Sequence, residues 1–301
     1  MSREFPFTKP VWPVQVPAPI PARSTGVYYD TSWSRSKLAN RTRSVFVDNV
    51  LRPAIHLLAR PSVEGAETLN LLDPPLIFVA NHCSHLDTPL MLSVLPKRFR
   101  EKVAVAAAAD YFFDRAWKAH LFSLTLAAIP VERKRPDRTS ARLAISLIED
   151  GWNLIIFPEG GRSSDGWMQE IRGGAAYMAE HTGRPLVPVY IDGTYAIMSK
   201  GGSRLQPGST KVTFGKPINH VGGEDARHIS ERIYQEFARL ADESSSNWWE
   251  ATKRAAAGTS PSPRGPEAAA WLRAWNLPSG SSDGASSRSG GNLQWRQHRQ
   301  Q

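Results

Sequence analysis

Cysteine is nearly absent from this chain of 301 residues, which contains Cys83 and no other. A disulfide framework is therefore excluded, and the composition is typical of a protein from a reducing compartment. No run reaches the roughly 18 to 20 consecutive apolar residues that a spanning helix needs. The first residues lack the layout of a signal peptide. We therefore expect a soluble or peripheral membrane protein.

Other signatures are missing as well. The sequence has neither a P-loop nor a GxGxxG segment. Cys83 directly adjoins His82, which is a poor geometry for a nucleophile and its base, so a small buried side chain is expected there. His82, His85 and Asp87 have no second cluster of ligands to complete a metal site, and we predict none.

Positive charge is concentrated at the two ends of the chain. The net charge is +9, of which residues 73–243 contribute +1 and the two flanks contribute +4 each. Basic flanks suggest an anionic lipid surface or a nucleic acid as partner, or a tail that charge keeps soluble. Because the core has no recognisable nucleic-acid motif, nucleic acid is the least favoured of these.

The composition divides the chain into four parts. Residues 1–33 are rich in proline and predict a disordered N-terminus, and residues 34–62 predict an amphipathic basic helical segment. Residues 63–243 alternate apolar runs with helical patterns and form the main domain. Residues 244–301 turn to Ser, Gly, Ala, Pro and Arg, which predicts a disordered tail, although this tail holds five of the ten tryptophans.

The helical segment has two opposed faces, and Pro53 is expected to kink or restart it. Such a helix either lies in a membrane interface or packs on the domain, and the sequence leaves both open. The apolar face consists of Val47, Val50, Leu51, Ala54, Ile55 and Leu58, and the polar side of Arg35, Lys37, Arg41, Arg43, Arg52 and Arg60.

The main domain is predicted to be α/β, with a mainly parallel central sheet and flanking helices. In such sheets, functional groups gather at the carboxyl ends of the strands. The expected strands are 75–80, 103–108, 127–132, 153–157, 186–191 and 210–214, and the expected helices are 86–95, 110–124, 138–149, 170–182 and 224–242.

One such strand end carries a histidine and an aspartate. Residues 81–87 read NHCSHLD and directly follow the apolar run 75–80. A neutral imidazole accepts a proton near pH 7, and a carboxylate on its second nitrogen fixes the tautomer and stabilises the imidazolium. His82 is therefore the candidate general base and Asp87 its orienting partner.

Three further blocks follow in order: AIPVERKR at 128–135, FPEGGRS at 157–163 and LVPVY at 186–190. Together with NHCSHLD they resemble the glycerolipid acyltransferases, typified by 1-acylglycerol-3-phosphate O-acyltransferases, over roughly residues 70 to 220. The resemblance implies the same roles for His82 and Asp87. It also implies acyl-CoA or acyl carrier protein as donor, with no resident cofactor, and a lysophospholipid or glycerol phosphate as acceptor.

Acceptor binding is assigned to the other blocks. Guanidinium groups match phosphate oxygens, so Arg133 and Arg162 are the candidate phosphate ligands. Glu159 is expected to accept a hydrogen bond from a glycerol hydroxyl or to orient an arginine. Gly160 and Gly161 permit a tight turn whose N–H groups point at an anion.

The sequence departs from the family pattern at two places. Gly161 replaces the usual threonine of FPEGTRS, and residues 105–111 lack the lysine that many relatives carry after the second strand. The missing cation weighs against lysophosphatidate as acceptor, but not against acyl transfer itself. We therefore expect an O-acyltransferase of phospholipid biosynthesis, peripheral on the cytoplasmic face of the cell membrane. The alternatives are acylation of another alcohol and a noncatalytic lipid-binding or membrane-adaptor protein on the same fold.

Overall fold

The computed structural model describes residues 26–132, 138–200 and 205–266. Seven strands form one sheet in the order β1-β7-β6-β2-β5-β3-β4. All neighbouring pairs are parallel except β6 and β7, so β1 and β7 run opposite to the other five. The strands are β1 (Pro61–Glu64), β2 (Ile77–Ala80), β3 (Val103–Ala108), β4 (Ala128–Val131), β5 (Asn153–Ile156), β6 (Leu186–Asp192) and β7 (Thr210–Phe214).

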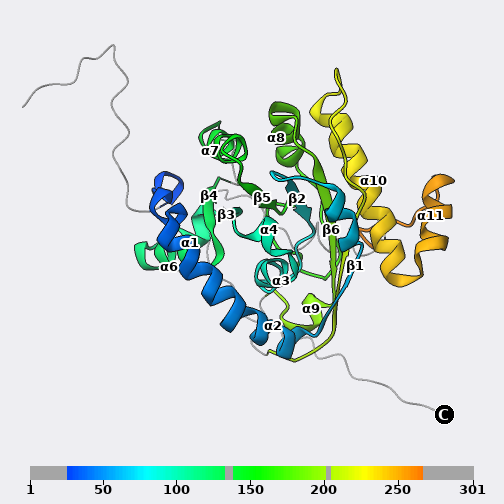
Figure 1. Cartoon of the computed structure of the whole chain (residues 1–301). Coiled ribbons are helices and arrows are strands. Elements are labelled where there is room, and N and C mark those ends of the chain that lie inside the picture. Colours follow the sequence, from blue (N-terminus) through cyan, green and yellow to red (C-terminus); the bar gives the residue numbers. More distant parts are fainter. Residues whose placement is uncertain (1–25, 133–137, 201–204, 267–301) are drawn as a thin grey trace, which may run out of the picture.

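Helices cover both faces of this sheet, which confirms the predicted α/β class (Figure 1). Short 3₁₀ turns at Gly26–Tyr28, Ser32–Arg35 and Ala66–Leu71 complete the described structure. The helices are α1 (Lys37–Phe46), a π-helical turn (Val47–Leu51), α2 (Arg52–Ala59), α3 (Asp87–Val94), α4 (Lys97–Arg100), α5 (Ala109–Phe112), α6 (Ala116–Leu126), α7 (Arg138–Glu149), α8 (Gly174–Thr182), α9 (Thr194–Ile197), α10 (Ala226–Ser245) and α11 (Trp248–Ala256).

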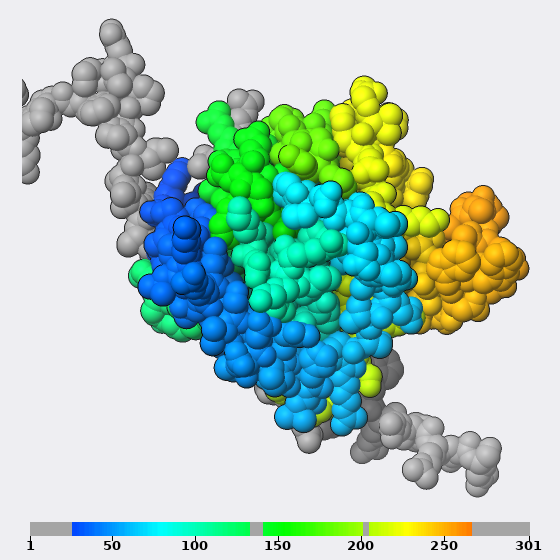
Figure 2. Space-filling model, viewed as in Figure 1, coloured from blue at the N-terminus to red at the C-terminus, as the bar shows by residue number. Residues whose placement is uncertain are grey.

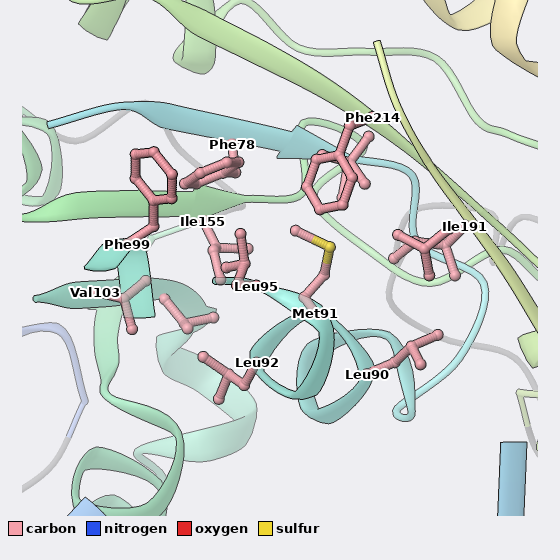
Figure 3. Close-up of a cluster of buried hydrophobic side chains, with 14 of the residues drawn as sticks. Phe78, Leu90, Met91, Leu92, Leu95, Phe99, Val103, Ile155, Ile191 and Phe214 are labelled. Carbon is pink, nitrogen blue, oxygen red and sulfur yellow. The ribbon is translucent and has the colours of Figure 1, made fainter. Parts of the chain in front are cut away.

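Strand β2 lies at the centre of the sheet and is buried on both sides. Successive strand side chains point to opposite faces, so Phe78 and Ala80 join one core cluster while Ile77 and Val79 join the other. The first cluster packs Phe78 and Ile155 against Met91 and other residues of α3 (Figure 3). This double burial fixes the end of β2, where the motif 81–87 begins.

The N-terminal helices cross one side of the domain as a nearly continuous rod (Figure 2). Pro53 stands in the first turn of α2, so the helix restarts there as predicted. Val47 and Ile55 are buried, whereas Val50 and Ala54 are exposed. The predicted apolar face is therefore only partly the packed face.

Arg43 corrects the predicted polar side of this rod. Its guanidinium is buried and donates to the carbonyl oxygens of Ser34, Ser123 and Leu124. Burial, with the nearby charge of Arg35, lowers the pKa of Arg43 to about 10. The side chain is a buried link between α1 and α6, because three of its hydrogen bonds reach backbone carbonyls and a fourth reaches the Asn40 side chain.

The prediction of disorder at both ends is wrong for the described residues that adjoin the main domain, 26–33 and 244–266. At the N-terminal end, Tyr29 is buried against Phe113. At the C-terminal end, α10 runs to Ser245 and α11 follows it, with Ala251 fully buried. Composition missed α11 because its packed face is small. Residues 1–25 and 267–301 lie outside the described residues.

Among the described residues, no helix has the length and apolarity to cross a bilayer.

Candidate active site

The predicted base and its carboxylate meet directly after β2. His82 lies in the loop between β2 and α3, and Asp87 is the first residue of α3. The His82 Nδ1 atom is 2.8 Å from Asp87 Oδ2. Because a carboxylate only accepts hydrogen bonds, Nδ1 carries the proton and Nε2 keeps its lone pair. The His82 side chain is 16% exposed and the Asp87 side chain 0%. A partly exposed imidazole thus rests on a fully buried carboxylate.

The Asp87 carboxylate is held by three further donors. Its Oδ2 accepts the backbone N–H groups of Cys83 and Ser84, each at 2.8 Å. Its Oδ1 accepts the hydroxyl of Thr194 at 2.6 Å, from the start of α9. Together with the His82 contact, these hydrogen bonds occupy both oxygens of the carboxylate. The loop folds around this carboxylate, so the motif itself supplies two of the N–H groups that bind it.

The main chain of His82 is fixed on both sides by the second motif. Its N–H donates to Glu159 Oε1 at 2.7 Å, and its carbonyl accepts the N–H of Ser163 at 2.8 Å. Glu159 Oε2 accepts the N–H of Gln169 at 2.7 Å. The imidazole also stacks on Phe157, with ring centroids 4.2 Å apart. The motifs 81–87 and 157–163 are distant in sequence, and their contacts meet at His82.

Glu159 is buried, and these two amide contacts give it a positioning role that its sequence interpretation did not include. Its predicted contact with a glycerol hydroxyl stays a prediction. The structure also supplies residues that sequence reasoning left without a role. Asn81 exchanges two hydrogen bonds with the main chain of Ile191, at 2.9 and 2.6 Å, which ties β2 to β6.

The glycines of the second motif shape the turn. Gly160 has φ +69°, a left-handed conformation that favours glycine, and an added Cβ would lie 3.0 Å from the Arg172 guanidinium. Gly161 follows it in the same turn and is partly exposed. The Arg172 N–H donates to the carbonyl of Pro158 at 2.8 Å, which closes the loop behind the turn.

Arg162 lies on the same side of the site as the two histidines. Burial, followed by the positive charge of Arg162, lowers the pKa of His85 to about 4. His85 is therefore neutral near pH 7, and its Nε2 lies 3.2 Å from the Tyr111 hydroxyl while the rings stack. The Lys200 ammonium donates to the Arg162 carbonyl at 3.3 Å. Arg133, the other predicted phosphate ligand, lies outside the described residues.

Cys83 is buried, and its thiol donates to the Gly166 carbonyl at 3.4 Å. Burial, followed by the charges of Asp87 and Glu159, raises the pKa of the thiol well above its usual range. Since the thiolate is the nucleophile, a thiol held in this way is unreactive. Across the part of the chain that the structure describes, no cluster of His, Cys, Asp and Glu has the makings of a metal site.

Thr194, Gln169 and the amides of Cys83 and Ser84 were not identified from the sequence. Thr194 had a weak signal, because it follows the β6 block as part of Asp192-Gly193-Thr194. The amide donors had none, since a backbone N–H is present in every loop. Their role emerges only from the path of the chain around Asp87.

Comparison with known proteins defines the class of this fold and site. Residues 60–192 match the Acyltransferase family. The solved structure of the 1-acyl-sn-glycerophosphate (LPA) acyltransferase PlsC from Thermotoga maritima is similar, with a TM-score of 0.50 and 25% identity. The match covers 68% of this chain and 78% of that one. The family model, the curated relatives and the solved structure together support a glycerolipid acyltransferase domain in this chain.

Two curated relatives illustrate the sequence similarity. The 1-acyl-sn-glycerol-3-phosphate acyltransferase BAT2, chloroplastic, of Brassica napus is 29% identical over 169 residues, or 55% of this chain and 47% of that protein. The 1-acyl-sn-glycerol-3-phosphate acyltransferase of Bacillus subtilis is 26% identical over 188 residues, or 62% of this chain and 86% of that protein. The chain thus spans about half the length of the plant relative.

Proposed function

We propose that this chain is an O-acyltransferase that moves a fatty acyl chain from acyl-CoA or acyl carrier protein to a hydroxyl of a lysophospholipid or glycerol phosphate. The observation that carries the proposal is the His82–Asp87 pair, a 2.8 Å contact between a partly exposed imidazole and a fully buried carboxylate. The names of the relatives make 1-acyl-sn-glycerol-3-phosphate the first acceptor to test.

The geometry suits direct transfer without an acyl-enzyme. His82 Nε2 takes the proton of the acceptor hydroxyl while the hydroxyl oxygen attacks the thioester carbonyl carbon. The C–S bond then breaks, and the imidazolium returns its proton to the leaving thiolate. Asp87 stabilises the imidazolium between these steps, because its carboxylate accepts the Nδ1–H and is fixed in place by three further hydrogen bonds.

Acceptor recognition is assigned to Arg162 and Arg133. Arg162 precedes Ser163, whose N–H donates to the His82 carbonyl, and its charge acts on His85, so a phosphate bound by Arg162 would bring a neighbouring hydroxyl toward His82. His85 is neutral near pH 7 and contributes hydrogen bonding rather than charge. Lys200, beside the Arg162 carbonyl, offers a cation where the sequence lacks the lysine common in relatives.

The membrane surface is the proposed partner, on its cytoplasmic face. The N-terminal rod exposes Leu57 at 80%, Leu38 at 76% and Val45 at 63%. These side chains stand among exposed basic residues such as Arg41 and Arg52. Apolar burial and attraction to anionic lipids act together at such a surface.

Point substitutions test the membrane contact better than truncation, since deleting the rod would also remove Ile55 and Ala59 from the core. We expect Leu38→Glu/Leu57→Glu to weaken binding to anionic vesicles several-fold in cosedimentation, because two exposed apolar contacts become anions. The control is Leu71→Glu, an equally exposed leucine in the 3₁₀ turn Ala66–Leu71 that follows β1. Equal binding by all three proteins would place the membrane contact elsewhere.

The activity itself is tested with radiolabelled acyl-CoA and a panel of lysophospholipids plus glycerol 3-phosphate, using the purified full chain. Labelled diacyl or monoacyl product supports acyl transfer and identifies the acceptor. Saturable lipid binding without product, with acyl-CoA and with acyl carrier protein thioesters, would favour the noncatalytic lipid-binding alternative instead.

A further inference from the structure

The described chain continues beyond α10 as far as residue 266, and part of this continuation contacts the candidate active-site region. Residues 247–266, named here the brace, lie outside the residues 60–192 that match the family. The brace consists of α11 and the segment after it. In Figure 1, α11 lies alongside α10 at the edge of the molecule.

The brace is anchored firmly at its start. The Arg254 guanidinium donates two hydrogen bonds to the buried carboxylate of Asp242 on α10, at 2.6 and 2.8 Å. Asn247 caps α11 by accepting the Glu250 N–H, and Ala251 is fully buried. A bidentate arginine–carboxylate pair is geometrically specific, so α11 has one orientation on α10.

After α11 the brace turns back toward the motif loop, defined as residues 163–169. The Pro263 carbonyl accepts the N–H of Met168 at 3.2 Å. Gly265 (φ +76°) packs against the indole of Trp167 so closely that an added Cβ would lie 2.5 Å from Cδ2 and 2.7 Å from Cγ. Since Cγ is the first ring atom, rotation of the ring alone gives little relief.

The motif loop is also tied to the main chain of His82. Its first residue, Ser163, donates to the His82 carbonyl, and its last, Gln169, donates to Glu159. Glu159 in turn accepts the His82 N–H at 2.7 Å. A continuous series of contacts therefore runs from Gly265 through Trp167 and the loop to the candidate base.

We propose that the brace, through Gly265 and Trp167, is a positioning element for His82. This inference rests on the proposed function. The space beside the contact is not filled: a cavity of about 550 Å³ lies there, lined by Trp167, Tyr190, Asp192 and the end of the brace. A displaced indole thus has room to move, and the loop would move with it while the core stays packed.

Two glycines of the brace provide a matched pair for the test. Gly265→Ala adds a methyl group against Trp167, whereas Gly258→Ala adds one at φ +68° with no atom within 4 Å. Both variants carry the same left-handed strain, so their difference isolates the contact. We expect Gly265→Ala to lower kcat roughly tenfold or more, as small misplacements of catalytic groups do. Gly258→Ala should stay near wild type, and the donor KM should change little in both.

Hydrogen exchange of the 163–169 peptide supplies a readout that needs no substrate. Exchange should accelerate in Gly265→Ala and not in Gly258→Ala, with β2 and β5 unchanged in both. Trp167→Ala removes the contact without backbone strain and should also lower kcat. In the Trp167→Ala background, adding Gly265→Ala should lower kcat no further than Gly258→Ala lowers it in the wild-type chain.

Equal rates in Gly265→Ala and Gly258→Ala, or a full rate in Trp167→Ala, would overturn the positioning role. Faster exchange without a change in kcat would overturn it as well. A wild-type chain that acylates none of the acceptors refutes the proposed function and the positioning role together, whereas an active wild type with a fully active Gly265→Ala variant refutes the brace alone.

Discussion

The two halves of the site are held with different firmness. In the catalytic half, the N–H, the carbonyl and the Nδ1 atom of His82 each have a partner, and its carboxylate Asp87 is fully buried. In the acceptor half, Arg162 is only partly buried, and the ammonium beside its carbonyl belongs to the exposed Lys200. The fold thus fixes the proposed base and leaves the proposed acceptor side open, so changes in the first should lower kcat and changes in the second should raise the acceptor KM.

Asp87→Asn should produce the largest effect among the supporting residues. The amide keeps the shape but removes the charge that stabilises the imidazolium and fixes the tautomer, so kcat should fall by about 10² to 10⁴-fold. Steady-state rates at saturating donor and acceptor measure this. A fall confined to the acceptor KM would place Asp87 in the binding half instead.

Thr194→Val should lower kcat by roughly tenfold, because it removes the 2.6 Å hydrogen bond to Asp87 Oδ1. The free energy of unfolding should fall by about 1.5 to 3 kcal/mol, the range for a hydrogen bond to a charged group. Thr210→Val is the matched control, since this buried hydroxyl donates to the Ala59 carbonyl in the N-terminal rod. It should cost stability without slowing turnover, and an equal loss of rate in both variants would mean that stability alone is responsible.

Arg162→Lys should have the mildest effect, raising the acceptor KM by about three- to tenfold while kcat and the donor KM change little. A point charge keeps the attraction to phosphate but loses the forked donors. Initial rates over a range of acceptor concentrations measure it, with Arg184→Lys as control, since Arg184 precedes the start of β6 and the site lies beyond the carboxyl end of the neighbouring strand β2. A change in the donor KM alone would assign Arg162 to the CoA phosphates.

Most of the sheet was predictable because its strands are apolar runs that end at motifs. The strand predictions 103–108 and 210–214 coincide with β3 and β7, and the helix 138–149 coincides with α7. Strand β1 was missed, since its exposed edge residues Ser62, Val63 and Glu64 have no apolar pattern. The helix predicted over 110–124 is divided into α5 and α6 at Phe113, which turns inward into the core.

The part of the site that lies within one sequence motif was predictable, and the part that depends on strand pairing was not. His82 and Asp87 lie five residues apart at one strand end, and this spacing together with the FPEGGRS block predicted the pair. Thr194 lies more than a hundred residues from Asp87, and its contact depends on how β6 pairs with β2. The positioning role of Glu159 was missed because its partners are backbone amides, which have no sequence signature.

The turnover of His82→Ala at saturating donor and acceptor tests the central claim most directly. The imidazole is partly exposed and is held in place by others, so its removal should leave the fold and vesicle binding intact. We expect acyl transfer to fall by at least about 10³-fold, while the thermal unfolding midpoint falls no further than in Thr194→Val, which also removes one hydrogen bond to Asp87. A variant that retained near wild-type turnover under these conditions would show that His82 is not the base.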